Sequence, residues 1–226
     1  MNFCEILLSK ILRRSRDSLF DYIIGYDHIK KLFRLSLNSD SVTHILLVGP
    51  PASAKTMFLT SLMNRSKNSY FADGSSSTKA GMNDYLFANK PRYLLIDEID
   101  KTCPKDQVFL INLMETGIVS ETKYGKTRSA QMKTSIFATS NNINKMSAAL
   151  QSRFFIVKLE PYTREQFCDI TKQLLSRGKK EGEVASVIAE AVWNTSQDIR
   201  DCVKIGAIAK STEDISFVLD TFVKPK

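Results

Sequence analysis

The stretch VGPPASAKTM, at positions 48–57, carries the residues best suited to bind phosphate. It nearly matches G-x-x-x-x-G-K-[ST], the pattern of a loop whose backbone N–H groups and lysine surround phosphate oxygens. Gly49, Lys55 and Thr56 are in place, but Ala52 and Ala54 replace two glycines of the commonest form. Glycine there permits close backbone approach and unusual torsions. We expect Lys55 to reach the β- and γ-phosphates of a nucleotide and the Thr56 hydroxyl to bind Mg²⁺.

Two carboxylates stand at the end of a second apolar run, LLIDEID, about 40 residues after the loop. Open parallel sheets bind their ligands at the carboxyl ends of the strands. Asp97 is therefore expected to hold Mg²⁺, and Glu98 to polarise an attacking water. An acidic pair on a strand end is common by itself, but the pair and the loop together predict a nucleoside triphosphate site with ATP and Mg²⁺.

Apolar runs and helical patterns alternate through the first two thirds of the chain. The expected strands are 43–49, 93–96, 134–141 and 154–159, and the expected helices between them include 55–67 and about 104–115. Strands that alternate with helices favour an α/β domain with a mostly parallel sheet.

The pattern becomes wholly helical after Pro161. Thr163 and Gln166 form a capping box that opens a helix to about Arg177. A second helix is expected over 183–194. A third carries Arg200 and is capped by Ser196 or Asp198, and a last one is capped by Thr212.

Composition limits the classes of protein that remain. The 226 residues suit one large domain, or a medium domain with a small one. The basic residues of MNFCEILLSKILRRSR follow its apolar ones, which is the reverse of a secretory signal, so we expect an amphipathic helix over 1–19 and a cytoplasmic protein. No apolar run approaches the roughly 18–20 residues that cross a bilayer. Four dispersed cysteines and two histidines argue against a zinc site.

The positive charge is unevenly distributed. Residues 160–226 hold 10 Lys+Arg against 11 Asp+Glu, a net charge of −1. Residues 1–159 hold 22 against 13, a net charge of +9. Such a basic segment is typical of proteins that bind a polyanion, either a nucleotide or a nucleic acid, although a generally basic surface is an equal alternative.

With these motifs in order, the sequence resembles an AAA+ ATPase from about residue 20 to residue 210. DYIIGYDHIKKL resembles the segment before the loop, where Ile23 and Ile24 would pack on the adenine. A methyl before the lysine also resembles the loops of minichromosome-maintenance helicases and of the MoxR group, and is thus compatible with a working site. The expected nucleotide-binding residues are Ile23, Ile24, Gly49, Pro50, Pro51, Ala52, Ser53, Ala54, Lys55, Thr56 and Met57.

Three later segments add polar residues to this resemblance. ATSNN resembles the end of the sensor-1 strand, with Asn141 orienting the lytic water. LQSRF resembles the arginine-finger motif, with Arg153 as the finger, and SQDIRDC resembles the sensor-2 helix, with Arg200 at the γ-phosphate. Taken singly, each has a structural alternative: a turn residue, a surface arginine, and an arginine paired with Asp198 or Asp201.

The implied fold is a P-loop NTPase parallel sheet core flanked by helices, followed by a small all-helical lid. The implied domains are an N-terminal helix over 1–19, the α/β nucleotide-binding core over 20–159 and the lid over 160–226. Because an arginine finger acts on a neighbour's nucleotide, a ring of identical subunits is expected, and the resemblance suggests six.

IVSETK and TRSAQMK flank YGKT and predict a β-hairpin whose turn centres on Gly125. It resembles the pre-sensor-1 hairpin of a group that includes the minichromosome-maintenance helicases, the bacterial Holliday-junction branch-migration motor, the MoxR group and protein unfoldases. The expected contacts to DNA or a partner are Lys123, Tyr124, Lys126 and Arg128; a solvated hairpin tip is the alternative. GSSSTKAGM, at 74–82, is a second candidate pore element.

Three functions follow from the resemblance. The first is an ATP-driven DNA motor of helicase or branch-migration type, favoured by the basic core and by the absence of an aromatic-hydrophobic-Gly pore loop in YFADGSSSTKAGM. The second is a protein remodeller or chaperone, and the third is a slow nucleotide-gated scaffold, which the two loop alanines keep open. Little of the chain lies outside the ATPase module, so target choice is expected to come from the pore or from an adaptor protein.

Overall fold

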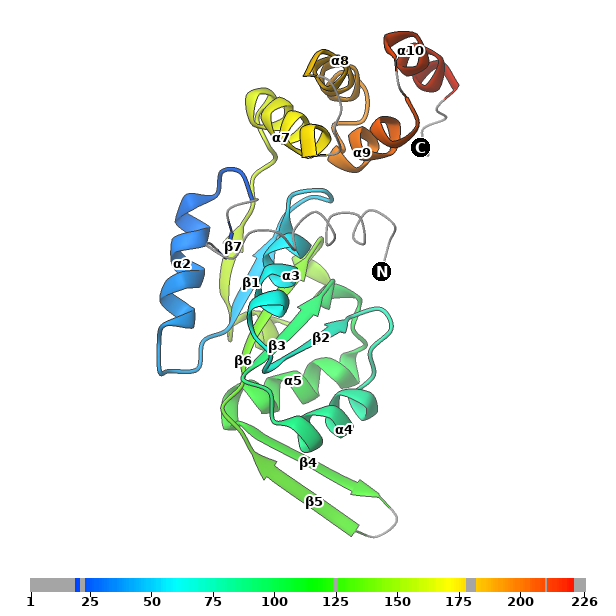
Figure 1. Ribbon diagram of the computed structural model, residues 1–226. Coiled ribbons are helices and arrows are strands. Elements are labelled where there is room, and N and C mark those ends of the chain that lie inside the picture. The colour runs from blue at the N-terminus through cyan, green and yellow to red at the C-terminus, as the bar shows by residue number, and fades with distance from the viewer. Residues whose placement is uncertain (1–18, 21–22, 124–125, 178–181, 210, 222–226) are drawn as a thin grey trace. The chain divides into compact units, whose positions relative to one another are not determined.

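The computed structural model describes residues 19–20, 23–123, 126–177, 182–209 and 211–221 (Figure 1). The chain divides into two compact units. One is Tyr26–Glu160; the other comprises the residues from Pro161 onward together with those that precede Tyr26. We refer to them as the α/β unit and the helical unit.

A five-stranded parallel sheet forms the centre of the α/β unit, with strand order β2-β3-β6-β1-β7. Its strands are β1 (Ile45–Val48), β2 (Ser69–Asp73), β3 (Tyr93–Asp97), β6 (Ser135–Ser140) and β7 (Phe155–Lys158). This sheet confirms the predicted α/β core and four predicted strands. The edge strand β2 was not predicted, because its apolar run, YFA, is only three residues long and Ala72 alone is fully buried.

Helices cover both faces of the sheet, as a parallel sheet requires. The helices and turns are α2 (Asp27–Leu37), α3 (Lys55–Arg65), α4 (Lys79–Asn89), η1 (Ile99–Lys101), α5 (Pro104–Thr116), η2 (Ile143–Lys145) and α6 (Ala148–Gln151). On one face, the Phe33 ring of α2 packs 5.1 Å from Phe58 of α3 and 5.3 Å from Phe137 of β6. On the other, Ile136 and Ala138 join the core formed with α4 and α5. Side chains that alternate along β6 thus serve the two layers.

The predicted hairpin is present between α5 and β6. Its strands, β4 (Ile118–Lys123) and β5 (Lys126–Gln131), pair antiparallel and extend from the sheet beside α4 (Figure 1). Gly117 ends α5 at a φ of 68°, close to the predicted helix end at about residue 115. The base of the hairpin is anchored by the fully buried Val119.

The helical unit contains α7 (Arg164–Arg177), α8 (Gly182–Trp193), α9 (Ile199–Ile208) and α10 (Thr212–Thr221). The capping box before α7 is confirmed, since the Thr163 N–H donates to Gln166 and the Gln166 N–H donates to Thr163 Oγ1. Asp198 caps α9 by accepting from the Arg200 N–H. The predicted cap of the last helix is displaced by one residue: Ser211 Oγ accepts from the Asp214 N–H, and the Asp214 carboxylate accepts from the Ser211 N–H.

Candidate nucleotide site

The loop between β1 and α3 contains two alanines in left-handed torsions. Ala52 has a φ of 62° and Ala54 a φ of 61°. These are the two positions where the sequence analysis noted missing glycines, and a left-handed torsion costs an L-residue about 1–2 kcal/mol. The loop therefore has the backbone conformation that glycine would favour, and the two alanines are strained because they adopt it.

Lys55 begins α3 and places its ammonium inside the loop. Its Nζ donates to the carbonyl oxygens of Gly49 at 2.8 Å and Pro50 at 2.6 Å, and to Ser53 Oγ at 3.2 Å. The residue is only 6% exposed, so these acceptors replace water around a buried charge. A bound phosphate oxygen would have to compete with them for the same three donors.

A hydrogen-bonded group joins the carboxyl ends of the central strands. Thr56 Oγ1 donates to the two carboxylate oxygens of Asp97 at 3.2 and 3.0 Å. Thr139 Oγ1 donates to Oδ1 of the same carboxylate and accepts from the Glu98 N–H at 2.9 Å. Hydroxyl and carboxylate oxygens are the ligands that Mg²⁺ prefers, so Thr56 and Asp97 suit the metal that the sequence predicts.

The carboxylate of Glu98 is held between two side chains. Oε1 accepts from Asn141 Nδ2 at 2.9 Å, and Oε2 accepts from Lys101 Nζ. The hydrogen bond to Glu98 raises the pKa of Lys101, and the charges of Glu98, Asp73 and Asp100 raise it further. Glu98 itself has a φ of 51°, a left-handed torsion that turns the chain from β3 into η1.

The structure thus brings Thr56, Asp97, Glu98 and Asn141 into one hydrogen-bonded group. Sequence reasoning missed Thr139, which is 1% exposed, and Lys101. Thr139 lies inside the predicted strand 134–141, and Lys101 directly follows the segment LLIDEID. Thr139 is two residues before Asn141, a spacing that places side chains on one face of a strand and was a usable signal.

The other predicted residues have contacts of their own. Arg153 Nη2 pairs with Glu115 Oε2 of α5 at 2.6 Å, and its Nη1 donates to the Ala149 carbonyl. Arg200, in the helical unit, forms an ion pair with Asp198 at 2.7 Å, one of the alternatives that the sequence left open.

The remaining residues predicted at the nucleotide belong to different parts of the chain. Ile23 is 1% exposed and belongs, with Ile24, to the helical unit. Pro50 and Pro51 are exposed in the loop, and Met57 lies in the first turn of α3.

The hairpin residues are described only in part. Tyr124 lies outside the described residues, as do the side chains of Lys123 and Lys126. The backbones of Lys123 and Lys126 form the last pair of the hairpin ladder. Arg128 pairs with Asp84 and Glu121.

Comparison with known proteins defines the class. The model of the ATPase family associated with various cellular activities (AAA) matches residues 45–162, from β1 to just past β7. This is more than half of the chain, and the chain belongs to this family of ATPases. The predicted resemblance to AAA+ ATPases is confirmed.

Two curated relatives are named as a probable DNA helicase and as a DNA replication licensing factor. The chain is 27% identical over 233 residues to "Probable DNA helicase MCM8" of Arabidopsis thaliana, covering 83% of this chain and 29% of the relative. It is 28% identical over 181 residues to the zygotic DNA replication licensing factor mcm6-A of Xenopus laevis, covering 61% of this chain and 22% of the relative. The chain spans less than a third of the length of either relative.

The solved structures that resemble this chain share its fold. The RuvB Holliday junction branch migration motor of Thermotoga maritima superposes with a TM-score of 0.64 at 21% identity, covering 87% of this chain and 69% of that chain. A point mutant of the same RuvB gives a TM-score of 0.69 at 21% identity, covering 90% of this chain and 72% of the mutant. In the described part of the chain no helix is long and apolar enough to cross a membrane.

Proposed function

We propose that this chain binds and hydrolyses ATP and uses the energy to act on DNA. The observation that carries the enzymatic half is the hydrogen-bonded group of Thr56, Asp97, Thr139, Glu98 and Asn141. In this group the Thr56 hydroxyl and the Asp97 carboxylate are suited to bind a metal. The Glu98 carboxylate is hydrogen-bonded to the Asn141 amide. These are the groups that phosphoryl transfer to water needs.

Each residue has a role in this proposal. Lys55 leaves the loop carbonyls and binds the β- and γ-phosphates, while Thr56 and Asp97 hold Mg²⁺. The bound ion supplies positive charge to the phosphate oxygens. Glu98 accepts a hydrogen bond from the attacking water and Asn141 keeps that carboxylate, or the water, in position.

The pair between Glu98 and Lys101 sets a condition on this role. A carboxylate oxygen that accepts from an ammonium is less available to a water. Oε1, which faces Asn141, is the oxygen that we assign to the water, and Oε2 stays with Lys101.

Two arginines complete the proposed site. Arg153 is the finger that acts in trans on a neighbouring subunit's nucleotide, a contribution of roughly 10³–10⁵ in rate in such enzymes. Arg200 reaches the γ-phosphate from the helical unit. Both must exchange their present partners, Glu115 and Asp198, for phosphate. A finger in trans implies a head-to-tail ring, for which we propose six subunits.

DNA is the proposed substrate. Its support is the net charge of +9 on residues 1–159, the hairpin with its lysines, and the relatives named as DNA helicase and replication licensing factors. In this proposal Lys123, Tyr124 and Lys126 near the hairpin tip contact the strand, with lysine at phosphates and tyrosine stacking on a base.

A slow nucleotide-gated switch is the second candidate. The strained torsions of Ala52 and Ala54 and the engagement of Lys55 with the loop carbonyls favour it. The carbonyl contacts of Lys55 compete with a phosphate for the ammonium, and the torsional strain lowers the stability of the loop.

Steady-state ATP hydrolysis by the purified chain, with and without single-stranded, duplex and branched DNA, tests the proposal. Glu98→Gln is the blank, and Glu165→Gln, an exposed change on α7, is the control for loss of a carboxylate. Turnover that DNA stimulates and that only Glu98→Gln abolishes supports a DNA-directed ATPase. Turnover indifferent to DNA points to a protein substrate, and nucleotide binding without turnover points to the switch.

A further inference from the structure

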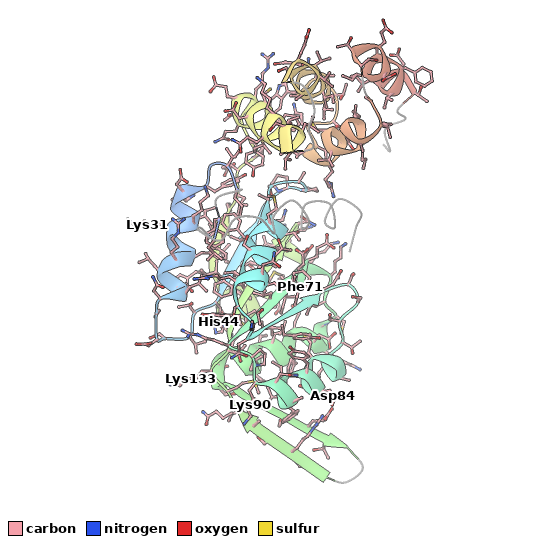
Figure 2. All side chains as sticks on the ribbon, viewed as in Figure 1. Lys31, His44, Phe71, Asp84, Lys90 and Lys133 are labelled. Carbon is pink, nitrogen blue, oxygen red and sulfur yellow. The ribbon has the colours of Figure 1, made fainter. Side chains whose placement is uncertain are left out.

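Arg128 of β5 ties the hairpin to α4. Its Nε and Nη2 donate to Glu121 Oε2 of β4 at 2.9 and 2.6 Å, and Nη2 also pairs with Asp84 of α4. Its guanidinium carbon lies 4.3 Å from the centre of the Phe87 ring, also on α4. Asp84 is labelled in Figure 2, where it lies on α4 near the hairpin. One side chain thus holds both strands of the hairpin and one helix.

These contacts engage Nε and Nη2 of Arg128, while 47% of the side chain stays exposed. Two carboxylates face one guanidinium, so the local charge of the three groups is negative, and a polyanion would be repelled rather than attracted. The ring of Phe87 covers a face of the guanidinium plane. The sequence predicted Arg128 as a DNA contact; its surroundings suit a structural bond better.

The other end of α4 is tied to the candidate nucleotide site. The segment before the helix follows β2, and the Gly74 N–H donates to the Asp97 carbonyl at 2.8 Å. A Cβ at Gly74 would collide with the Glu98 carbonyl oxygen, so the two backbones are in close contact. The first turn of α4 is fixed by Thr78, which accepts from the Gly81 N–H, and by the Lys79 N–H, which donates to Asp106 of α5.

We propose that Arg128 is a positioning residue that makes α4 and the β4–β5 hairpin one body, so that a change at Asp97 and Glu98 moves the hairpin through Gly74 and α4. Gly74 joins the site to the start of α4, and Arg128 joins α4 to the hairpin. The inference rests on the proposed function for the event at Glu98. The bond between Arg128 and α4 stands independently of it.

Hydrogen exchange of the full chain tests both parts. Amides of β5 are followed in the nucleotide-free protein, with ADP and with a non-hydrolysable ATP analogue, for the wild type and Arg128→Gln. Lys133→Gln, just after β5 and labelled in Figure 2, is the matched control, because it removes the same charge from the base of the hairpin without touching Asp84, Glu121 or Phe87. Asp84→Asn provides a second route to the same loss.

In the nucleotide-free protein, Arg128→Gln should speed exchange in β5 on the order of threefold to tenfold, the loss of an exposed ion pair and a cation–π contact. Lys133→Gln should leave it unchanged. Asp84→Asn should have a smaller effect and should add little in the Arg128→Gln background, because the two changes break one bond. Equal exchange in Arg128→Gln and Lys133→Gln would refute the proposal that Arg128 holds the hairpin to α4.

With nucleotides, the wild type should show a difference between the ATP analogue and ADP both at 98–101 and in β5. Arg128→Gln should keep the first difference and lose the second, which a merely stabilising residue would not do. A β5 difference that persists in Arg128→Gln overturns the transmission, as does a wild-type difference confined to 98–101. If the ATP analogue and ADP give the same exchange both at 98–101 and in β5, the proposed nucleotide function is rejected, and with it the coupling of the hairpin to the site. The nucleotide-free comparison still tests whether Arg128 holds the hairpin to α4.

Discussion

Replacing Ala52 by glycine should stabilise the α/β unit, although glycine elsewhere weakens a fold. Ala52 has a φ of 62°, a torsion that costs an L-residue about 1–2 kcal/mol and glycine almost nothing. Glycine also has greater conformational freedom in the unfolded chain, which lowers stability by about 0.4–1 kcal/mol and offsets part of the gain. The expected change is a rise in the free energy of unfolding of about 0.5–1 kcal/mol.

Ala54 has nearly the same torsion but a different environment, and the two alanines should therefore respond differently. Ala54 is 8% exposed, so its methyl is packed, and removing a buried carbon costs about 0.8 kcal/mol. This loss cancels most of the relieved strain. Ala54→Gly should leave stability within about 0.5 kcal/mol of the wild type.

Urea unfolding followed by far-ultraviolet circular dichroism measures these changes. Ala88→Gly is the control, because Ala88 is exposed in the last turn of α4, where glycine should lower stability by up to about 0.5 kcal/mol. The single tryptophan, Trp193, lies in the helical unit, so its fluorescence reports whether that unit is affected. If Ala52→Gly destabilises as much as Ala88→Gly does, the left-handed assignment of the loop is wrong.

Four further results are expected. Thr139→Val should lower stability by about 1–3 kcal/mol and slow ATP turnover, because it leaves a carboxylate oxygen and an N–H without their buried partner; Thr139→Ser should restore both. Arg153→Ala should bind ATP normally yet lose hydrolysis, and subunits that cannot bind nucleotide should rescue it when mixed; a mixture without recovery contradicts the trans role. Burial lowers the pKa of His44 from 6.5 to about 4, and Nδ1 accepts from the Ile136 N–H. Since the unfolded chain takes up this proton at a higher pH than the native one, stability should fall as pH drops from 6.5 to 4, by up to about 3 kcal/mol, a fall that is absent in His44→Gln. Lys126→Ala should weaken DNA binding and reduce its salt slope by about one, measured by fluorescence anisotropy; an unchanged slope argues against a phosphate contact.

Most of the fold could be predicted from local sequence patterns. Four strands, the capping box before α7 and the end of α5 at Gly117 were predictable because each depends on an apolar run or on a few consecutive residues. The edge strand β2 was not, since its apolar run, YFA, is only three residues long. The cap of α10 was misplaced by one residue because Ser211 and Thr212 are both good caps, and only the backbone selects between them.

The sequence by itself determined the spacing of Lys55, Thr56, Asp97 and Glu98, because a phosphate loop and a strand end are local structures whose residues are read in order. It also determined where the loop lacks glycine. Only the tertiary structure decided that those alanines keep left-handed torsions. The strand order places β3 beside β6, and for this reason Thr139 becomes a hydrogen-bond partner of Asp97. In the same way, packing of the hairpin on α4 decides that Arg128 meets carboxylates and an aromatic ring, because residues distant in sequence become neighbours only when the core forms.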